Sequence, residues 1–221
     1  MNKVTFLERT TQNYDWAIVV IIFIILLIAV VKTNFENRYS DYMRLFISDK
    51  YIKIYKDGSL IMSWFTVILF VVQIFSFSFF LLLILDYYDI HSKYDGIIFV
   101  QIFTFLFVFI LAKFLIEKII ATAFDIEDFV DQFNMQKVSY RTYISMLLLP
   151  INIFLFYNNY LNKTVYLILI ITILFLNVVN YTKSIKTFQK LVFKNLLYFI
   201  LYLCTLEIAP YYFIYHWFIE R

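Results

Sequence analysis

The sequence predicts an all-α fold, a polytopic membrane helix bundle with about six transmembrane helices and amphipathic segments at the cytoplasmic interface. Of the 221 residues, 63% are hydrophobic, whereas a soluble domain has about 45–50% apolar residues. Only 16% are charged, against about 25% in a typical globular protein. A soluble chain of this length could not bury so much apolar surface. Residues 1–221 are therefore expected to form one integral membrane domain.

Six long apolar runs supply the predicted helices. A helix needs roughly 20 residues to cross a hydrocarbon core of about 30 Å. The first and fourth runs are shorter than the others, and the remaining four are close to this length or above it. The predicted spans cover residues 16–31, 60–85, 96–118, 142–159, 164–182 and 196–218.

The first run is expected to be a retained helix rather than a cleaved signal peptide, because mixed charges including Glu8 and Asp15 precede it and no small-residue cleavage site follows. Glycine is rare, and neither Gly58 nor Gly96 lies in the middle of a span. Helix contacts must therefore rely on aromatic and branched side chains, with help from small residues such as Ser76.

The loops predict the orientation. Lys and Arg are concentrated in the first, third and fifth loops, the third through Lys137 and Arg141. Positively charged loops face the cytoplasm. Both termini are therefore expected outside the inner membrane, on the periplasmic side.

Two of these loops have helical patterns. In the first, Tyr39 and Met43 begin an apolar face, with Arg38, Asp41 and Arg44 between them, which is typical of a helix lying in the interface. In the fifth, four lysines lie three or four residues apart and so share one helix face. They are candidate lipid head-group contacts, at about 1 kcal/mol each, although an ordinary positive-inside anchor is the favoured interpretation: Lys183, Lys186, Lys190 and Lys194.

Glu207 is the most unusual residue at membrane depth. It lies eleven residues into the sixth run, about 16 Å from the end of that helix. A carboxyl at this depth must be protonated, paired or hydrated. Pro210 follows three residues later and leaves a backbone carbonyl without its helical partner.

Other spans place amides at similar depth, namely Gln73, Asn152 and Asn177. With Glu207 they form a candidate intramembrane polar site, for a proton or ion relay or for a substrate. Hydrogen bonds that fix the bundle, at about 0.6–2 kcal/mol each, are the favoured alternative for the set. For Glu207 alone, the functional and structural interpretations stay equally open.

Two further charged groups lie near the end of the third span. Lys113 and Glu117 are four residues apart and can pair, although extension toward the interface is the favoured interpretation. An acidic run follows, in which a divalent cation could bind. A solvated helix face is favoured over such a site for Asp125, Glu127, Asp128 and Asp131.

No pattern predicts catalysis. Cys204, the single cysteine, excludes an intrachain disulfide, and no nucleophile elbow, phosphate loop or zinc helix is present. The sequence predicts no catalytic residue, no metal and no cofactor. The net charge of +3 gives no reason to expect nucleic acid as a partner; the expected partners are the lipid bilayer and other membrane proteins or further copies of the chain.

The chain resembles a family of uncharacterised Bacteroidota integral membrane proteins, known as a domain of unknown function. The resemblance rests on length, span pattern, the stretch from Leu206 to Pro210 with Glu207 in it, and the first loop near Lys50 and Tyr51. It implies an inner-membrane location in a Gram-negative cell and brings no activity with it.

Three functions follow as hypotheses. The favoured one is a non-enzymatic membrane component, an accessory subunit of an envelope complex, because a long first loop occurs without a catalytic signature. The first alternative is a small proton-coupled transporter built around Glu207. The second is a lipid-modifying membrane enzyme that uses the acidic run.

Overall fold

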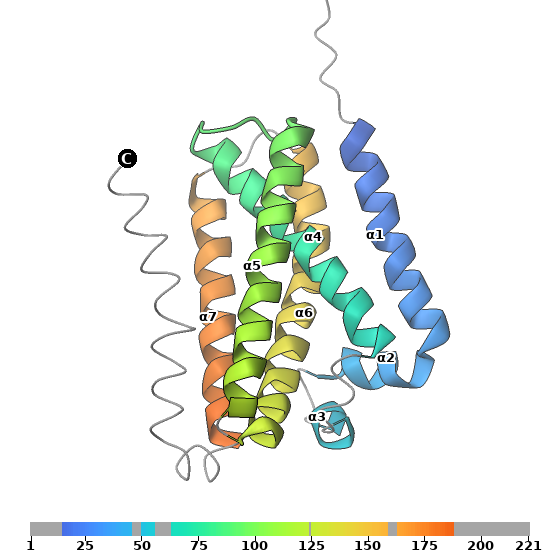
Figure 1. Ribbon diagram of the computed structural model, residues 1–221. Helices are drawn as coiled ribbons and strands as arrows, with labels where there is room; N and C mark the ends of the chain where they lie inside the picture. The colour runs from blue at the N-terminus through green and yellow to red at the C-terminus, as the bar shows by residue number, and fades with distance from the viewer. Residues whose placement is uncertain (1–14, 46–49, 56–62, 124, 159–162, 188–221) are drawn as a thin grey trace, which may run out of the picture.

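The computed structural model describes residues 15–45, 50–55, 63–123, 125–158 and 163–187. The fold of these residues is all-α, as predicted (Figure 1). The seven helices are α1 (Asp15–Asn34), α2 (Glu36–Met43), α3 (Lys50–Ile54), α4 (Trp64–Tyr87), α5 (Gly96–Ala123), α6 (Glu127–Tyr157) and α7 (Lys163–Thr187).

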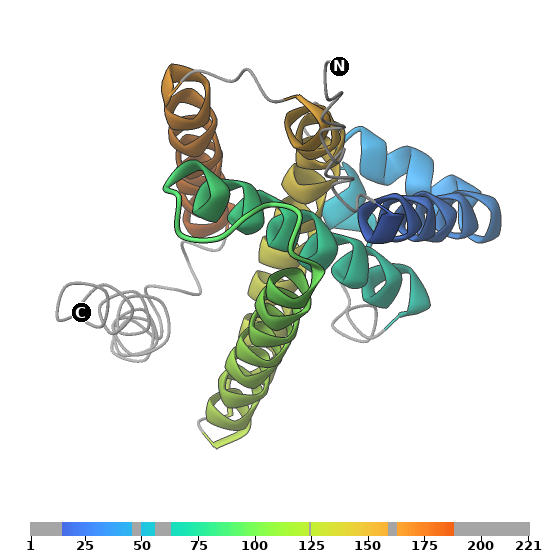
Figure 2. The same ribbon diagram turned by 90° about the horizontal axis from the view of Figure 1, so that it is seen from above.

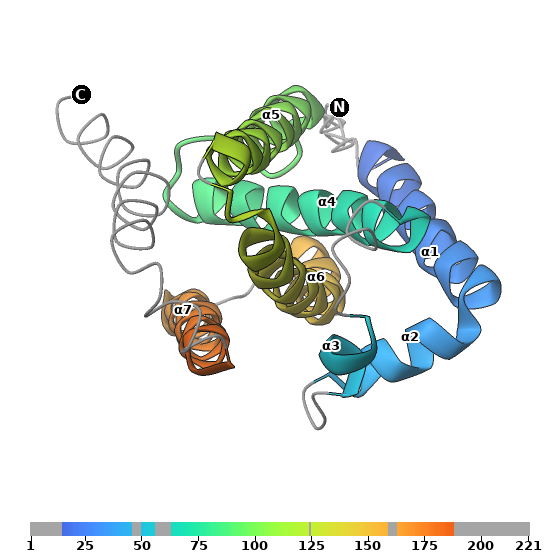
Figure 3. The same ribbon diagram turned by 60° about the horizontal axis from the view of Figure 1, so that its bottom comes forward.

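Helix α4 is the centre of the arrangement. It crosses the bundle obliquely and packs against α1, α5 and α6 (Figures 1 and 2). Helix α7 packs against α6. The short helices α2 and α3 lie together at one end of the bundle, where α1 ends and α4 begins (Figure 3). We call this the α2–α3 end.

Among the described residues, four helices are long and apolar enough to cross a membrane, namely α1, α4, α5 and the Val130–Tyr157 part of α6. At 1.5 Å per residue, even the 20 residues of α1 extend about 30 Å. The apolar part of α7, Leu167–Val179, is shorter. The chain therefore has the features of a multi-pass membrane protein. The predicted sixth span, 196–218, lies outside the described residues.

Helix α6 is longer than the predicted fourth span. It begins at Glu127, fifteen residues before the predicted start, and Pro150 lies inside it without ending it. Lys137 and Arg141, predicted to lie in the third loop, belong to this helix. The reason is burial: Phe133, Met135 and Tyr140 pack inside the bundle, so the mixed polar stretch is part of the fold rather than a connector.

Aromatic rings build the core at the end where α5 begins. The Trp16 ring centroid lies 4.9 Å from that of Phe99 and 5.9 Å from that of Phe79, and its Nε1 donates a 3.0 Å hydrogen bond to the Tyr94 carbonyl. A Cβ on Gly96 would lie 3.3 Å from the Trp16 ring. The absence of a side chain there lets the start of α5 approach α1.

Candidate functional site

A buried polar seam runs between α4 and α6, and we define it by Gln73 and Ser76 on α4 and Ser145 and Asn152 on α6. Each of the four is at most 2% exposed. The Ser76 hydroxyl donates a 2.7 Å hydrogen bond to the Ser145 carbonyl. The Asn152 amide donates a 2.7 Å hydrogen bond to the Ser76 carbonyl. The small Ser76 side chain allows this close approach of two helices, as the sequence suggested.

Two atoms of the polar seam have no hydrogen-bond partner among the described residues. They are Nε2 of Gln73, a donor, and Oδ1 of Asn152, an acceptor. A buried amide without a partner costs about 1–3 kcal/mol. The polar seam is therefore a structural connection between two helices and also holds unused hydrogen-bonding capacity.

The structure brings only part of the predicted polar layer together. Gln73 and Asn152 share the α4–α6 interface, whereas Asn177 is exposed on α7. Its Nδ2 donates a 2.9 Å hydrogen bond to the Ile173 carbonyl of the same helix. Glu207 lies outside the described residues. Of the four lysines predicted to contact lipid head groups, two belong to α7, namely Lys183 and Lys186. The other two, Lys190 and Lys194, lie outside the described residues.

A second buried polar group, the Arg38 cluster, lies at the α2–α3 end. Arg38 is 8% exposed, and its guanidinium donates hydrogen bonds to Ser63 (2.8 Å), Thr66 (3.3 Å) and Tyr51 (3.4 Å). These bonds connect α2 to α3 and to the start of α4. The guanidinium carbon also lies over three rings, at 4.5–5.9 Å from the centroids of Phe65, Tyr55 and Tyr51.

Tyr42 extends the connection to α6. Its hydroxyl donates a 2.9 Å hydrogen bond to Oγ1 of Thr142, and its ring meets those of Tyr51 and Phe65 edge-on at 5.5 and 5.7 Å. Burial raises the pKa of Tyr42 far above its ordinary value, although the bond to Thr142 opposes this shift. The phenol is therefore neutral in the folded protein.

These contacts correct the predicted orientation of the first loop. The sequence pattern placed Tyr39 and Met43 on the buried face, with Arg38 on the polar side. In the structure Arg38, Tyr42 and Leu45 are buried, and Met43 is 37% exposed. The buried face of α2 contains both apolar residues and a charged one, because aromatic rings of α3 and α4 surround the Arg38 guanidinium. The sequence of α2 alone does not show those rings, so its pattern could not predict the burial of Arg38.

Glu117 also has a partner that the sequence did not indicate. Its carboxylate pairs with the Lys137 ammonium of α6 at 3.3 Å, and the side chains are only 4% and 12% exposed. The predicted extension of Glu117 into the interface is wrong, because the polar start of α6 packs beside it. This buried ion pair connects α5 and α6.

The acidic run lies at the turn between α5 and α6. Asp125 has a φ of 54°, and both Asp125 and Glu127 are exposed, whereas Asp131 is half-buried. Among the residues that the structure describes, no group of three His, Cys, Asp or Glu side chains could hold a metal ion. The predicted enzyme that would use this run stays a hypothesis.

No curated protein matches the chain, and no solved structure does. One protein family, described as "Domain of unknown function (DUF4271)", matches residues 17–218, from near the start of α1 to the predicted sixth span. Because this match covers most of the sequence, the chain belongs to the DUF4271 family.

Proposed function

We propose that this protein is a non-enzymatic multi-pass component of a Gram-negative inner membrane, acting as an accessory subunit of an envelope complex. One observation carries the proposal. Helices α2 and α3, which we call the interfacial platform, are held to α4 by the Arg38 cluster and to α6 by Tyr42. The two short helices therefore form a fixed surface.

The outward side of the interfacial platform has a mixed chemical character. Met43 is 37% and Ile54 52% exposed, Arg44 is exposed, and Lys50 pairs with Asp41 at 3.1 Å on the surface. A protein interface combines an apolar centre with a polar rim, and the interfacial platform exposes residues of both kinds. Because the surface is already ordered, a partner would bind it at a lower entropic cost.

Purification of the tagged full-length protein in a mild detergent tests the proposal. The wild type is expected to bring down one stoichiometric protein, and Arg44→Glu is expected to lose it. Lys118→Glu is the matched control, because Lys118 is also an exposed basic residue and lies on α5, outside the interfacial platform. Equal retention or equal loss in both variants would contradict the platform as the docking surface, as would a wild type that purifies alone.

A proton-coupled carrier is the second candidate, and the polar seam favours it. Gln73 and Asn152 leave one donor and one acceptor unused inside a helix pair of the membrane domain, and bound water, which both donates and accepts, could use these groups. The carrier would depend on the carboxyl of Glu207. Glu207→Gln keeps hydrogen bonding and removes the titratable proton, so full complementation by this variant at normal membrane levels would rule out the carrier.

A further inference from the structure

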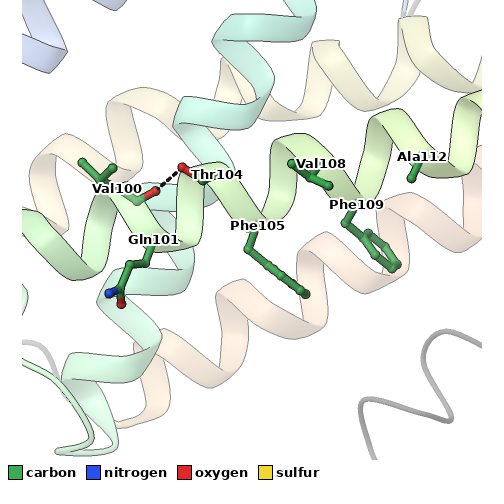
Figure 4. Close-up of a pocket in the computed structure, with 7 residues that line it drawn as sticks. All are labelled: Val100, Gln101, Thr104, Phe105, Val108, Phe109 and Ala112. Atoms are coloured by element: carbon green, nitrogen blue, oxygen red, sulfur yellow. Dashed lines mark hydrogen bonds between the residues drawn. The ribbon is translucent and has the colours of Figure 1, made fainter.

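Helix α5 has an apolar groove of about 630 Å³ along one face (Figure 4). Phe105 and Val108 are part of its lining and are 58% and 57% exposed. Helix α5 crosses the apolar layer with most of its surface uncovered by the described residues. Lipid tails alone would satisfy a purely apolar groove, so its polar residues decide what occupies it.

Two residues of the groove are polar. The Thr104 hydroxyl donates a 2.8 Å hydrogen bond to the Val100 carbonyl of its own helix. The Gln101 amide has no hydrogen-bond partner in the part of the chain that the structure describes, and it is exposed. An unpartnered amide in hydrocarbon is costly. Gln101 therefore favours an occupant that brings a hydrogen-bonding group to this depth.

We propose that residues 196–218 of the same chain occupy this groove as a helix antiparallel to α5, with the Glu207 carboxyl paired to the Gln101 amide. A protonated carboxyl and a primary amide each offer a donor and an acceptor, so the two can form a pair of hydrogen bonds. The apolar residues of the segment cover the apolar residues of the groove.

Chain length supports this occupant. Helix α7 ends at Thr187, at the α2–α3 end of the bundle (Figure 1). The connector 188–195 has eight residues and reaches at most about 28 Å, which is about three times the usual 8–10 Å between packed helix axes. Residues 196–218 can therefore start at that end and return along α5.

The depths also agree. Glu207 is eleven residues from Leu196, which is about 16 Å along a helix. Leu196 closely follows the charged Lys194, so the matching point on α5 is Lys113, the first charged residue beyond the groove; counted from Lys113, Thr104 lies about 14 Å and Gln101 about 18 Å along the axis. Glu207 thus falls between the two polar residues of the groove. Cys204, one helical turn nearer the α2–α3 end, falls level with Phe105.

Disulfide trapping with the natural Cys204 tests the proposal on the full chain in native membranes. Phe105→Cys and Val108→Cys each place a thiol in the groove, and two variants guard against one failing to insert. Phe107→Cys is the matched control, because Phe107 lies at the same depth but its ring contacts Phe70 of α4 at 6.4 Å. After oxidation and denaturation, free thiols are counted by the mass added with a polyethylene glycol maleimide.

At least one groove variant is expected to lose both thiols in a monomer-sized band, while Phe107→Cys keeps both. A disulfide-linked dimer would instead place a second copy in the groove, and two free thiols in both groove variants would leave it to lipid; either result overturns the proposal. Adding Gln101→Leu to the variant that cross-links is expected to lower the yield several-fold. An unchanged yield would contradict the pairing with Glu207.

Discussion

The hydroxyl of Tyr42, on a short helix outside the four long apolar helices, donates a hydrogen bond to Thr142 within one of them, across 2.9 Å. The single hydroxyl proton of Thr142 is in turn shared between the carbonyls of Val138 and Ser139 in its own helix, both 3.0 Å from its Oγ1. The two residues are 100 positions apart in the sequence. Their bond fixes α2 to α6.

Replacing Tyr42 by Phe is expected to destabilise the protein by about 1 kcal/mol, because it removes one buried hydrogen bond and keeps the ring contacts. A denaturant titration of the protein in detergent measures this change in the free energy of unfolding. Tyr88→Phe is the control, since Tyr88 is 61% exposed and should change stability by a few tenths of a kcal/mol at most. Equal losses in the two variants would contradict the importance of this bond.

The buried Tyr42 phenol also predicts a dependence on alkaline pH. Its pKa in the folded state is raised above the ordinary value of 10.0, so the unfolded chain releases this proton first. The stabilising effect is complete below pH 10 and is lost as the pH rises above it, by up to about 1.4 kcal/mol per pH unit. Stability measured from pH 9 to 11 should fall less steeply in Tyr42→Phe than in the wild type or in Tyr88→Phe.

Arg38→Lys is expected to cost about 2 kcal/mol. Lysine cannot reproduce the planar fork that reaches Ser63 and Thr66, and it stacks less well on Phe65. The same substitution at Arg44, which is exposed, should stay within about 0.5 kcal/mol. A tolerated Arg38→Lys, measured by the same denaturant titration, would show that charge alone matters in the Arg38 cluster.

Ser76 and Ser78 form a matched pair for testing the polar seam. Both are buried on α4, but Ser76 bonds across to the Ser145 carbonyl, whereas Ser78 bonds at 2.8 Å to the Ile74 carbonyl of its own helix. Ser76→Ala is expected to destabilise by about 0.6–2 kcal/mol, and Ser78→Ala by much less. A larger effect at Ser78 would contradict the assignment of the α4–α6 connection to Ser76.

The sequence predicted those helices that a single uninterrupted apolar run defines. The uninterrupted apolar run starting at Trp16 became α1, and the run starting at Gly96 became α5. It underestimated α6 because residues 127–141 carry charges and amides that resemble a solvated loop. Only the packed bundle shows that Met135 and Tyr140 are covered.

The contacts that define the candidate sites could not be predicted, because their partners are distant in sequence. Lys137 is 20 residues from Glu117, and Arg38 depends on Phe65 from another helix. Local periodicity assigns an arginine to the solvent side, since unpaired charges are rarely buried. Tertiary contacts with aromatic rings and hydroxyls reverse that assignment here.

Hydrogen–deuterium exchange of the full-length protein in lipid nanodiscs tests the central claim, that α2 is fixed to the membrane domain. The backbone amides of residues 39–43 are expected to exchange far more slowly than an unfolded peptide in the wild type, because opening them requires the loss of the Arg38 and Tyr42 contacts. Arg38→Gln should accelerate their exchange and leave α4 protected. Fast exchange of residues 39–43 in the wild type, or no change in Arg38→Gln, would contradict the claim.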